Sequence, residues 1–295
     1  MNVKIATDWE GPWVLNDFAY EVSSKLYSPQ FFEKLSSYDD YLAYEVKKPG
    51  YNPGDTLRLI APFLVAKGVN SDYLKKVSKP VFLKKALTSS KALDFELIVV
   101  STAYEQFLEV SCSLLGMSYK GTAFTPEKYE MDREEREFLL RVAELVPKMS
   151  FDELNRLFWR EMKKLETSWE ILNEVKVMGG ERKKEVAEEF EANVCIGDSI
   201  SDSKMLEFGL ERGIAVSFNG NKYAIENSNV AVISDSSTEL ALLIHVYAKR
   251  GMDGVKKLCE ARECYYMISE ENFDDVVRLS ENMRRRVRGN AGKLG

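Results

Sequence analysis

Apolar residues in this chain fall into short runs, and polar or turn-forming residues follow each run, as in the buried strands of a parallel sheet. The first run opens at Val3 and stops before Asp8, and Gly11-Pro12 then breaks the chain into a loop. Later runs cover residues 95–100, 193–197, 213–218 and 230–233. Helical patterns lie between these runs, so we expect an α/β protein with a parallel sheet flanked by helices.

Two long stretches between the runs predict helices. In the stretch 17–87, Asn16 or Asp17 can cap a helix that starts near Phe18, and the turn-rich residues 49–55 separate it from a helix over residues 56–66. In the stretch 131–172, Ser150 and Glu153 have the spacing of a capping box. The tail adds a short helix, the run 264–268 and a helix over 270–288, whose arginines at 284–286 are expected to form an exposed end.

Composition excludes several classes of protein. The chain has 295 residues, of which 45% are hydrophobic and 30% charged, as in a globular protein with a sizeable core. The net charge of -6 disfavours nucleic acid as a partner. Apolar runs are too short for a membrane span, and the N-terminal residues lack the layout of a signal peptide. We therefore expect a cytoplasmic protein.

Histidine and cysteine offer little chemistry. The single histidine, His245, lies in an apolar helical pattern, which disfavours Ser-His-Asp hydrolysis and multi-histidine metal sites. Four cysteines lack zinc-type spacing and are expected to be reduced, mostly buried thiols. Carboxylates must carry any chemistry.

Acidic residues follow two of the predicted strands. Asp8 and Glu10 come directly after the first run, and Asp198 and Asp202 follow the run 193–197. Ligands of open α/β sheets bind just beyond the carboxyl ends of strands, so these carboxylates can share a site. One of the first pair could act as a nucleophile and metal ligand and the other as a general acid/base. Alternatively, Asp8 and Glu10 belong to a surface turn that is acidic without taking part in any chemistry.

These motifs, DWEGP and GDSISD, together resemble those of the haloacid dehalogenase (HAD) superfamily of phosphohydrolases. The resemblance implies a phosphate-binding hydroxyl at Ser101, with Thr102 as the alternative, and a lysine at Lys183, with Lys184 as the alternative. Alternatively, the basic residues 182–184 are simply the exposed start of a helix and have no role in phosphate binding. Asn219 matches an asparagine near the phosphate, although Asn-Gly turns also occur for local reasons.

The resemblance also implies a domain plan. The HAD-like, Rossmann-like core comprises residues 1–16, 88–130 and 173–250. A helical cap, residues 17–87, resembles that of the phosphoserine-phosphatase-like branch. Residues 131–172 form a further helical insertion, and residues 251–295 a C-terminal helical extension.

The implied activity is Mg²⁺-dependent hydrolysis of a small phosphorylated metabolite through an aspartyl-phosphate on Asp8. Mg²⁺ would be held by Asp8, the carbonyl of Glu10 and Asp198, while Asp202 orients Lys183 or a metal-bound water. Ser101 and Lys183 would hold the phosphoryl oxygens, and Glu10 would act as general acid and then base. The cap would close over the site and select the substrate.

For the substrate, the cap residues Asp17 and Arg58 match acid and base positions of the same branch, but they also suit a helix cap and an exposed helix face. Glu10 stands where the superfamily has aspartate, and Pro12 replaces the usual hydroxyl residue. A second hypothesis is therefore a catalytically weak binding or assembly subunit, with a protein partner or a homodimer contact through residues 131–172. The opening motif is also similar to an archaeal group, some members of which are labelled accessory subunits of an energy-converting hydrogenase.

Overall fold

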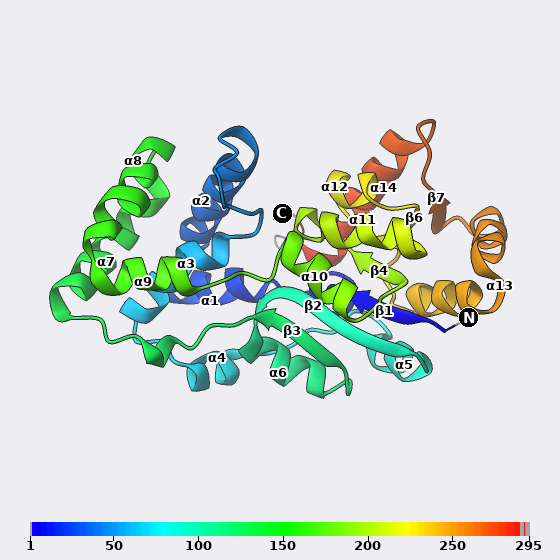
Figure 1. The fold of residues 1–295 in the computed structure, drawn as a ribbon, viewed down its shortest axis with the longest axis horizontal. Helices are drawn as coiled ribbons and strands as arrows, with labels where there is room; N and C mark the ends of the chain where they lie inside the picture. The colour runs from blue at the N-terminus through cyan, green and yellow to red at the C-terminus, as the bar shows by residue number, and fades with distance from the viewer. Residues whose placement is uncertain (1, 290–291, 293–295) are drawn as a thin grey trace.

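A computed structural model describes residues 2–289 and 292, and it contains a seven-stranded sheet flanked by helices (Figure 1). The strands run in the order β3-β2-β1-β4-β5-β6-β7. All neighbours are parallel except β6 and β7, which pair antiparallel. The strands are β1 (Lys4–Thr7), β2 (Glu96–Tyr104), β3 (Ser118–Thr122), β4 (Val194–Gly197), β5 (Ile214–Phe218), β6 (Val230–Val232) and β7 (Tyr265–Met267). This confirms the expected α/β class.

The order of the strands reverses between β1 and β4. From β1 the chain adds β2 and β3 on one side of the sheet, and it then returns to place β4 on the other side. Ile5 pairs with Val194 and Thr7 with Ile196, so the two strands end at the same level. Such a switch point leaves a crevice at the carboxyl ends of the strands, where α/β proteins bind ligands.

Helices make up most of the remaining chain. They are α1 (Phe18–Leu26), α2 (Pro29–Asp40), α3 (Thr56–Ala66), α4 (Ser71–Val77), α5 (Ala86–Ala92), α6 (Glu105–Ser113), α7 (Arg133–Leu145), α8 (Phe151–Arg156), α9 (Glu166–Glu174), α10 (Glu181–Glu189), α11 (Ser203–Arg212), α12 (Lys222–Glu226), α13 (Thr238–Ala261) and α14 (Phe273–Arg288). Helix α3 has the bounds that the sequence predicts, and Asp17 caps α1 by accepting a hydrogen bond from the N–H of Tyr20. Ser150 and Glu153 form the predicted capping box of α8.

Helices from the two predicted helical stretches pack into one group, which we call the helical body: α2, α3, α7, α8 and α9 (Figure 1). Its centre is aromatic. Phe158 stacks on Tyr38 of α2 with ring centroids 5.9 Å apart, and it meets Phe63 of α3 edge-on. Residues 131–172 are therefore not a separate insertion in space, because they complete a core that residues 17–87 begin.

The C-terminal segment differs from the predicted helical extension. The run at 264–268 forms β7, which extends the sheet next to β6. Val276, Ser280 and Arg284 of α14 are buried, which places this helix against the protein. Among the described residues, no helix is both long and apolar enough to cross a membrane.

Candidate functional site

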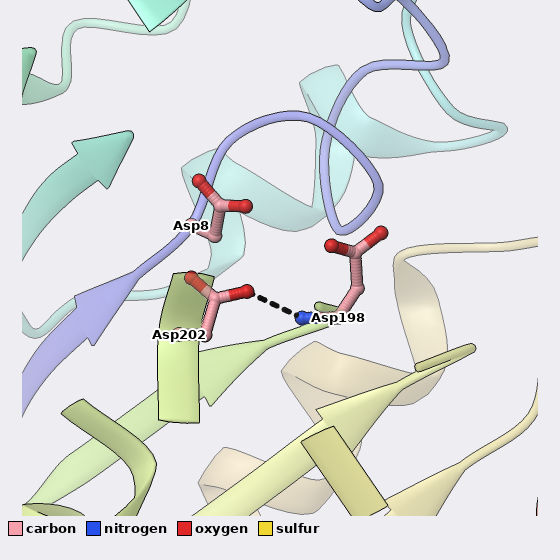
Figure 2. Close-up of side chains that lie close together, drawn as sticks. All are labelled: Asp8, Asp198 and Asp202. Atoms are coloured by element: carbon pink, nitrogen blue, oxygen red, sulfur yellow. Dashed lines mark hydrogen bonds between the residues drawn. The ribbon is translucent and has the colours of Figure 1, made fainter. Parts of the chain in front are cut away.

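A pocket lies at the carboxyl ends of β1 and β4, between the sheet and the helical body. Its lining includes Asp8 from the loop after β1, Asp198 from the loop after β4, and Asp39 from α2. Figure 2 shows Asp8, Asp198 and Asp202 gathered beyond the strand ends. One carboxylate oxygen from each lies within 4.8 Å of the others, and all three residues are buried. The convergence expected from the two sequence motifs is therefore present in the structure.

Lys183 of α10 lies between two of these carboxylates. Its Nζ is 2.5 Å from Asp202 Oδ1 and 3.0 Å from Asp8 Oδ1, and its side chain is fully buried. Buried charges are stable only when they are paired, so this lysine and the two aspartates form one unit. Of the two alternatives from the sequence, the structure brings Lys183 into the site and leaves Lys184 partly exposed.

Asp202 holds the loop that carries Asp198. Its Oδ2 accepts hydrogen bonds from the N–H groups of Asp198 and Ser199, each 3.0 Å long (Figure 2 shows the first of them). Its Oδ1 accepts from Lys183. Asp202 thus orients the lysine, one of the two roles expected for it.

Asp198 is paired with two arginines from the C-terminal helix. Its Oδ2 accepts from Nη1 of Arg284 at 2.6 Å and from Nη1 of Arg288 at 3.1 Å. The carbonyl of Asp198 also accepts from Arg284, at 2.7 Å. The prediction of an exposed arginine cluster is wrong for Arg284, which is 4% exposed.

The arginines carry a periodic signal that the sequence analysis passed over. Arg284 follows Val276 and Ser280 at intervals of four, the spacing of one helix face, and both of those residues are buried. Arg288 continues the same face. A basic residue in register with a buried face is a candidate for an internal ion pair, whereas Arg285 and Arg286 point outward and are exposed.

Two glycines allow the acidic groups to approach the backbone. A Cβ on Gly11 would lie 2.1 Å from Asp198 Oδ2, and the φ of Gly11 is +115°. A Cβ on Gly197 would lie 2.4 Å from Cβ of Asp202. The glycines of DWEGP and GDSISD are thus required by close packing around the carboxylates.

Burial alters the protonation of Asp8. It raises the pKa of Asp8 to about 7, the charge of Asp202 adds to the rise, and Lys183 opposes it. Asp8 Oδ1 is buried and lies 3.0 Å from Lys183 Nζ, which balances its charge and leaves the oxygen able to accept a cation or a proton as well.

Glu10 and Asp17 lie together at the start of α1. Glu10 Oε1 accepts from the N–H of Phe18 at 2.7 Å, while Asp17 caps the same helix. Burial raises the pKa of Glu10 well above its ordinary value, and the charge of Asp17 adds to this. Both residues also line the pocket. Asp17 therefore caps α1, as one of the two predictions has it, and it also lines the pocket.

The two hydroxyl candidates at the end of β2 differ in position. Thr102 lines the pocket beside Ala103. Ser101 is fully buried, is not part of the lining, and has its Oγ accepting a hydrogen bond from the N–H of Ala103 at 3.3 Å. The structure therefore places Thr102, the alternative hydroxyl from the sequence, in the pocket lining and leaves Ser101 behind it.

Two further predicted residues do not reach the pocket. The side-chain amide of Asn219 donates to the carbonyl of Ser234 and accepts from its N–H, so it ties the ends of β5 and β6 together. Arg58 donates to the carbonyl of Leu172 and pairs with Asp55 at 3.5 Å, which links α3 to α9. Neither residue lines the pocket. Hydrogen bonding to Ser234 beyond β6 explains Asn219, and Arg58 is a half-buried structural residue rather than an exposed one.

The donor set suits a hard divalent cation. Mg²⁺ takes carboxylate oxygens together with water, and Asp8 and Asp198 present carboxylates on adjacent loops. Asp202 contributes charge, although both of its oxygens already accept hydrogen bonds. The buried Oδ1 of Asp8, which has acceptor capacity left beside Lys183, supports the fit, and the arginines on Asp198 oppose it.

Comparison with known proteins identifies a relative. No family model matches the chain, and no curated protein matches it. Among solved structures, gene product AF1437 from Archaeoglobus fulgidus matches with a TM-score of 0.92 and 32% sequence identity, over 100% of this chain and 99% of that chain. The chain belongs to the same family as AF1437. This relationship establishes the fold, and the activity has to be argued from the site.

Proposed function

We propose that the protein is a Mg²⁺-dependent phosphatase of the HAD superfamily, acting on a small phosphorylated metabolite. The observation that carries the proposal is the buried unit of Asp8, Lys183 and Asp202 beside Asp198, at the switch point of a parallel sheet. A nucleophilic carboxylate next to a lysine is the arrangement that phosphoryl transfer to an aspartate requires.

In this proposal Asp8 attacks the phosphorus and the leaving alcohol departs, which gives an aspartyl-phosphate. Lys183 stabilises the negative charge on the phosphoryl oxygens, and its contact with Asp202 holds it in place. Thr102, at the end of β2, is the proposed hydroxyl for the phosphoryl group, since it lines the pocket and Ser101 does not. Asp8 and Asp198 would hold Mg²⁺, which supplies charge neutralisation for the phosphoryl group.

Glu10 is the proposed acid for the leaving group. Burial raises its pKa well above the ordinary value, which favours the protonated form that a general acid requires. Proton donation from Oε1 requires Glu10 to give up its contact with the N–H of Phe18. The same residue would then accept a proton from the water that attacks the aspartyl-phosphate.

The helical body corresponds in this proposal to the cap of a HAD protein. Asp39 and Asp40 of α2 and Leu57 of α3 line the pocket opposite the strand ends. Closure of this body over a bound ligand would exclude water and select substrates by size.

Phosphate release from p-nitrophenyl phosphate and a panel of small phosphomonoesters, with Mg²⁺, Mn²⁺ and Co²⁺, tests the proposal. The wild type should hydrolyse at least one ester, and Asp8→Asn should abolish the activity while the protein stays folded. Asp94→Asn, an exposed site with the same chemical change, is the control and should match the wild type. Activity that survives in Asp8→Asn would contradict the proposal, as would no turnover with any ester and metal.

A second candidate is a binding or assembly subunit with little turnover. The contact of Glu10 with the start of α1 favours it, because this carboxylate already serves the fold. Residues 131–172 complete the core of the helical body, so their deletion would test folding rather than binding. A substitution of Leu145 tests partner binding without disturbing that core, because this residue at the end of α7 is 53% exposed. In this candidate, Leu145→Lys loses a co-purifying partner and Asp8→Asn keeps it.

A further inference from the structure

The charges that line the pocket are unbalanced. Its acidic lining residues are Asp8, Glu10, Asp17, Asp39, Asp40 and Asp198. In the part of the chain that the structure describes, the positively charged lining residues are Arg284 and Arg288, both from α14. An anion that enters the pocket therefore has its favourable contacts with charged lining residues at these two guanidinium groups.

Hydrogen bonds to Asp198 and to the loop after β1 position the arginine pair. Arg284 and Arg288 are one helical turn apart, and both donate to the same oxygen, Oδ2 of Asp198. Arg288 also donates through Nη2 to the carbonyl of Asn16 at 2.6 Å. These contacts attach α14 to the loop after β1, which carries Glu10 and Asp17. The side chains of both arginines are almost completely buried, at 5% and 6% exposed.

One oxygen of Asp198 therefore already has two cationic partners. A divalent ion bound at Asp8 and Asp198 would add a third positive group beside it, and the like charges would repel one another. A guanidinium group binds the oxygens of a phosphate group in the same planar geometry as those of a carboxylate. An anion in the pocket thus offers Arg288 an alternative partner to Asp198.

We propose that Arg288, supported by Arg284, binds an anion in the pocket in addition to Lys183, and that it couples anion binding to cation binding through Asp198. Without an anion, Arg288 pairs with Asp198 and weakens the binding of a divalent cation. With an anion bound, Arg288 turns to it, and Asp198 Oδ2 keeps one guanidinium partner, Arg284, so that less positive charge opposes the cation. This inference takes the identity of the anion, a phosphate group, from the proposed function. The coupling between anion and cation binding does not depend on that function.

Isothermal titration of the full-length protein with Mg²⁺, with and without inorganic phosphate, tests the coupling without any turnover. In the wild type, phosphate should raise the affinity for Mg²⁺ about fivefold or more. In Arg288→Met, phosphate affinity should fall about tenfold or more, Mg²⁺ should bind more tightly than in the wild type when phosphate is absent, and the coupling should largely disappear. Arg285→Met, an exposed change on the same helix, should behave as the wild type.

Thermal unfolding checks that Arg288→Met remains folded. If it does not fold, Arg288→Lys answers the same question, because it keeps the charge but cannot reach Asp198 and Asn16 together, and it should lose most of the coupling. Independent binding of Mg²⁺ and phosphate in the wild type would overturn the inference, as would unchanged coupling in the arginine variant.

The result is distinguishable from failure of the proposed function. A wild type that hydrolyses esters but binds the two ions independently rejects this inference alone. A wild type that shows the coupling and hydrolyses no ester supports the anion-binding role of Arg288 and rejects the phosphatase.

Discussion

Asp198 depends on the residues packed around its Oδ2 atom. Two arginines neutralise Oδ2, and the backbone of Gly11 lies so close that no side chain fits between them. A buried carboxylate without such partners would be protonated or expelled into water. The Gly-Pro that follows the two acids of the first motif is thus part of the site as well as the end of a strand.

Gly11→Ala should destabilise the protein strongly. The new methyl group would collide with Asp198, and the φ of +115° is itself unfavourable for alanine, so we expect a loss on the order of 3 kcal/mol in the free energy of unfolding. Gly50→Ala is the matched control, since Gly50 also has a positive φ but open space around its Cα. Its cost should be about 1 kcal/mol. Urea unfolding compares the two, and equal losses would contradict the steric account.

Asp39 is a buried carboxyl group in the pocket wall. Burial raises its pKa to about 7. In the unfolded chain this pKa is about 3.9, so between these values the folded state binds the extra proton. Asp39 therefore contributes stability at low pH that is lost as the pH rises towards 7.

Asp39→Asn should remove this pH dependence. The amide oxygen can still accept from the N–H of Gly54 and the hydroxyl of Thr56. Relative to the variant, the wild type should lose about 3 kcal/mol of unfolding free energy between about pH 5 and about pH 8. Urea unfolding at both pH values measures the difference, with Asp94→Asn as an exposed control. Parallel pH profiles of wild type and Asp39→Asn would disprove the shift.

Sequence reasoning succeeded for residues whose chemistry follows directly from a strand end. Asp8, Asp198 and Asp202 were found because acids after apolar runs meet at one edge of a parallel sheet. Asn219 lies outside the pocket lining because its amide is used by Ser234, a contact between the ends of β5 and β6 that the sequence does not reveal. Arg288 was missed because its partner Asp198 is far away in the chain, and no local pattern encodes that contact.

At the scale of elements, local signals were reliable and long-range pairing was not. The bounds of α3 follow from the turn before Thr56 and the glycine after its last residues. The strand β7 has three residues, and only its pairing with β6 makes it a strand. The helices of residues 131–172 bury their apolar faces against α2 and α3, and the sequence alone does not state which face meets which.

One aromatic contact joins the helical body to the sheet side of the molecule. Tyr44 follows α2 in a π-helical turn (Tyr41–Glu45) and stacks on Tyr223 of α12, with ring centroids 5.4 Å apart and an interplanar angle of 9°. Because these elements come from opposite sides of the pocket, this stack should help to hold the two parts together.

A double-mutant cycle with Tyr44→Ala and Tyr223→Ala should give a coupling of about 1 kcal/mol in the free energy of unfolding. A cycle of Tyr41→Ala with Tyr223→Ala is the control, since Tyr41 stacks on Phe151 instead. Its coupling should be near zero. Equal couplings in the two cycles would show that the Tyr44–Tyr223 contact is not specific.

At the scale of the whole molecule, the site exists because three distant parts of the chain meet at one switch point. The loop after β1 supplies Asp8, the segment around β4 supplies Asp198 and Asp202, and the last helix supplies the arginines. The sheet order that brings β1 beside β4 is therefore the feature on which the site depends. The helical body then forms the opposite wall of the pocket.

The most direct measurement is to mix the protein with p-nitrophenyl phosphate and Mg²⁺, quench the mixture in acid, and map any covalent phosphoryl group by peptide mass spectrometry. The account predicts a phosphoryl group on Asp8 in the wild type and none in Asp8→Asn. A phosphoryl group on another residue, or ester hydrolysis that proceeds with no covalent phosphoryl group on Asp8, would contradict it.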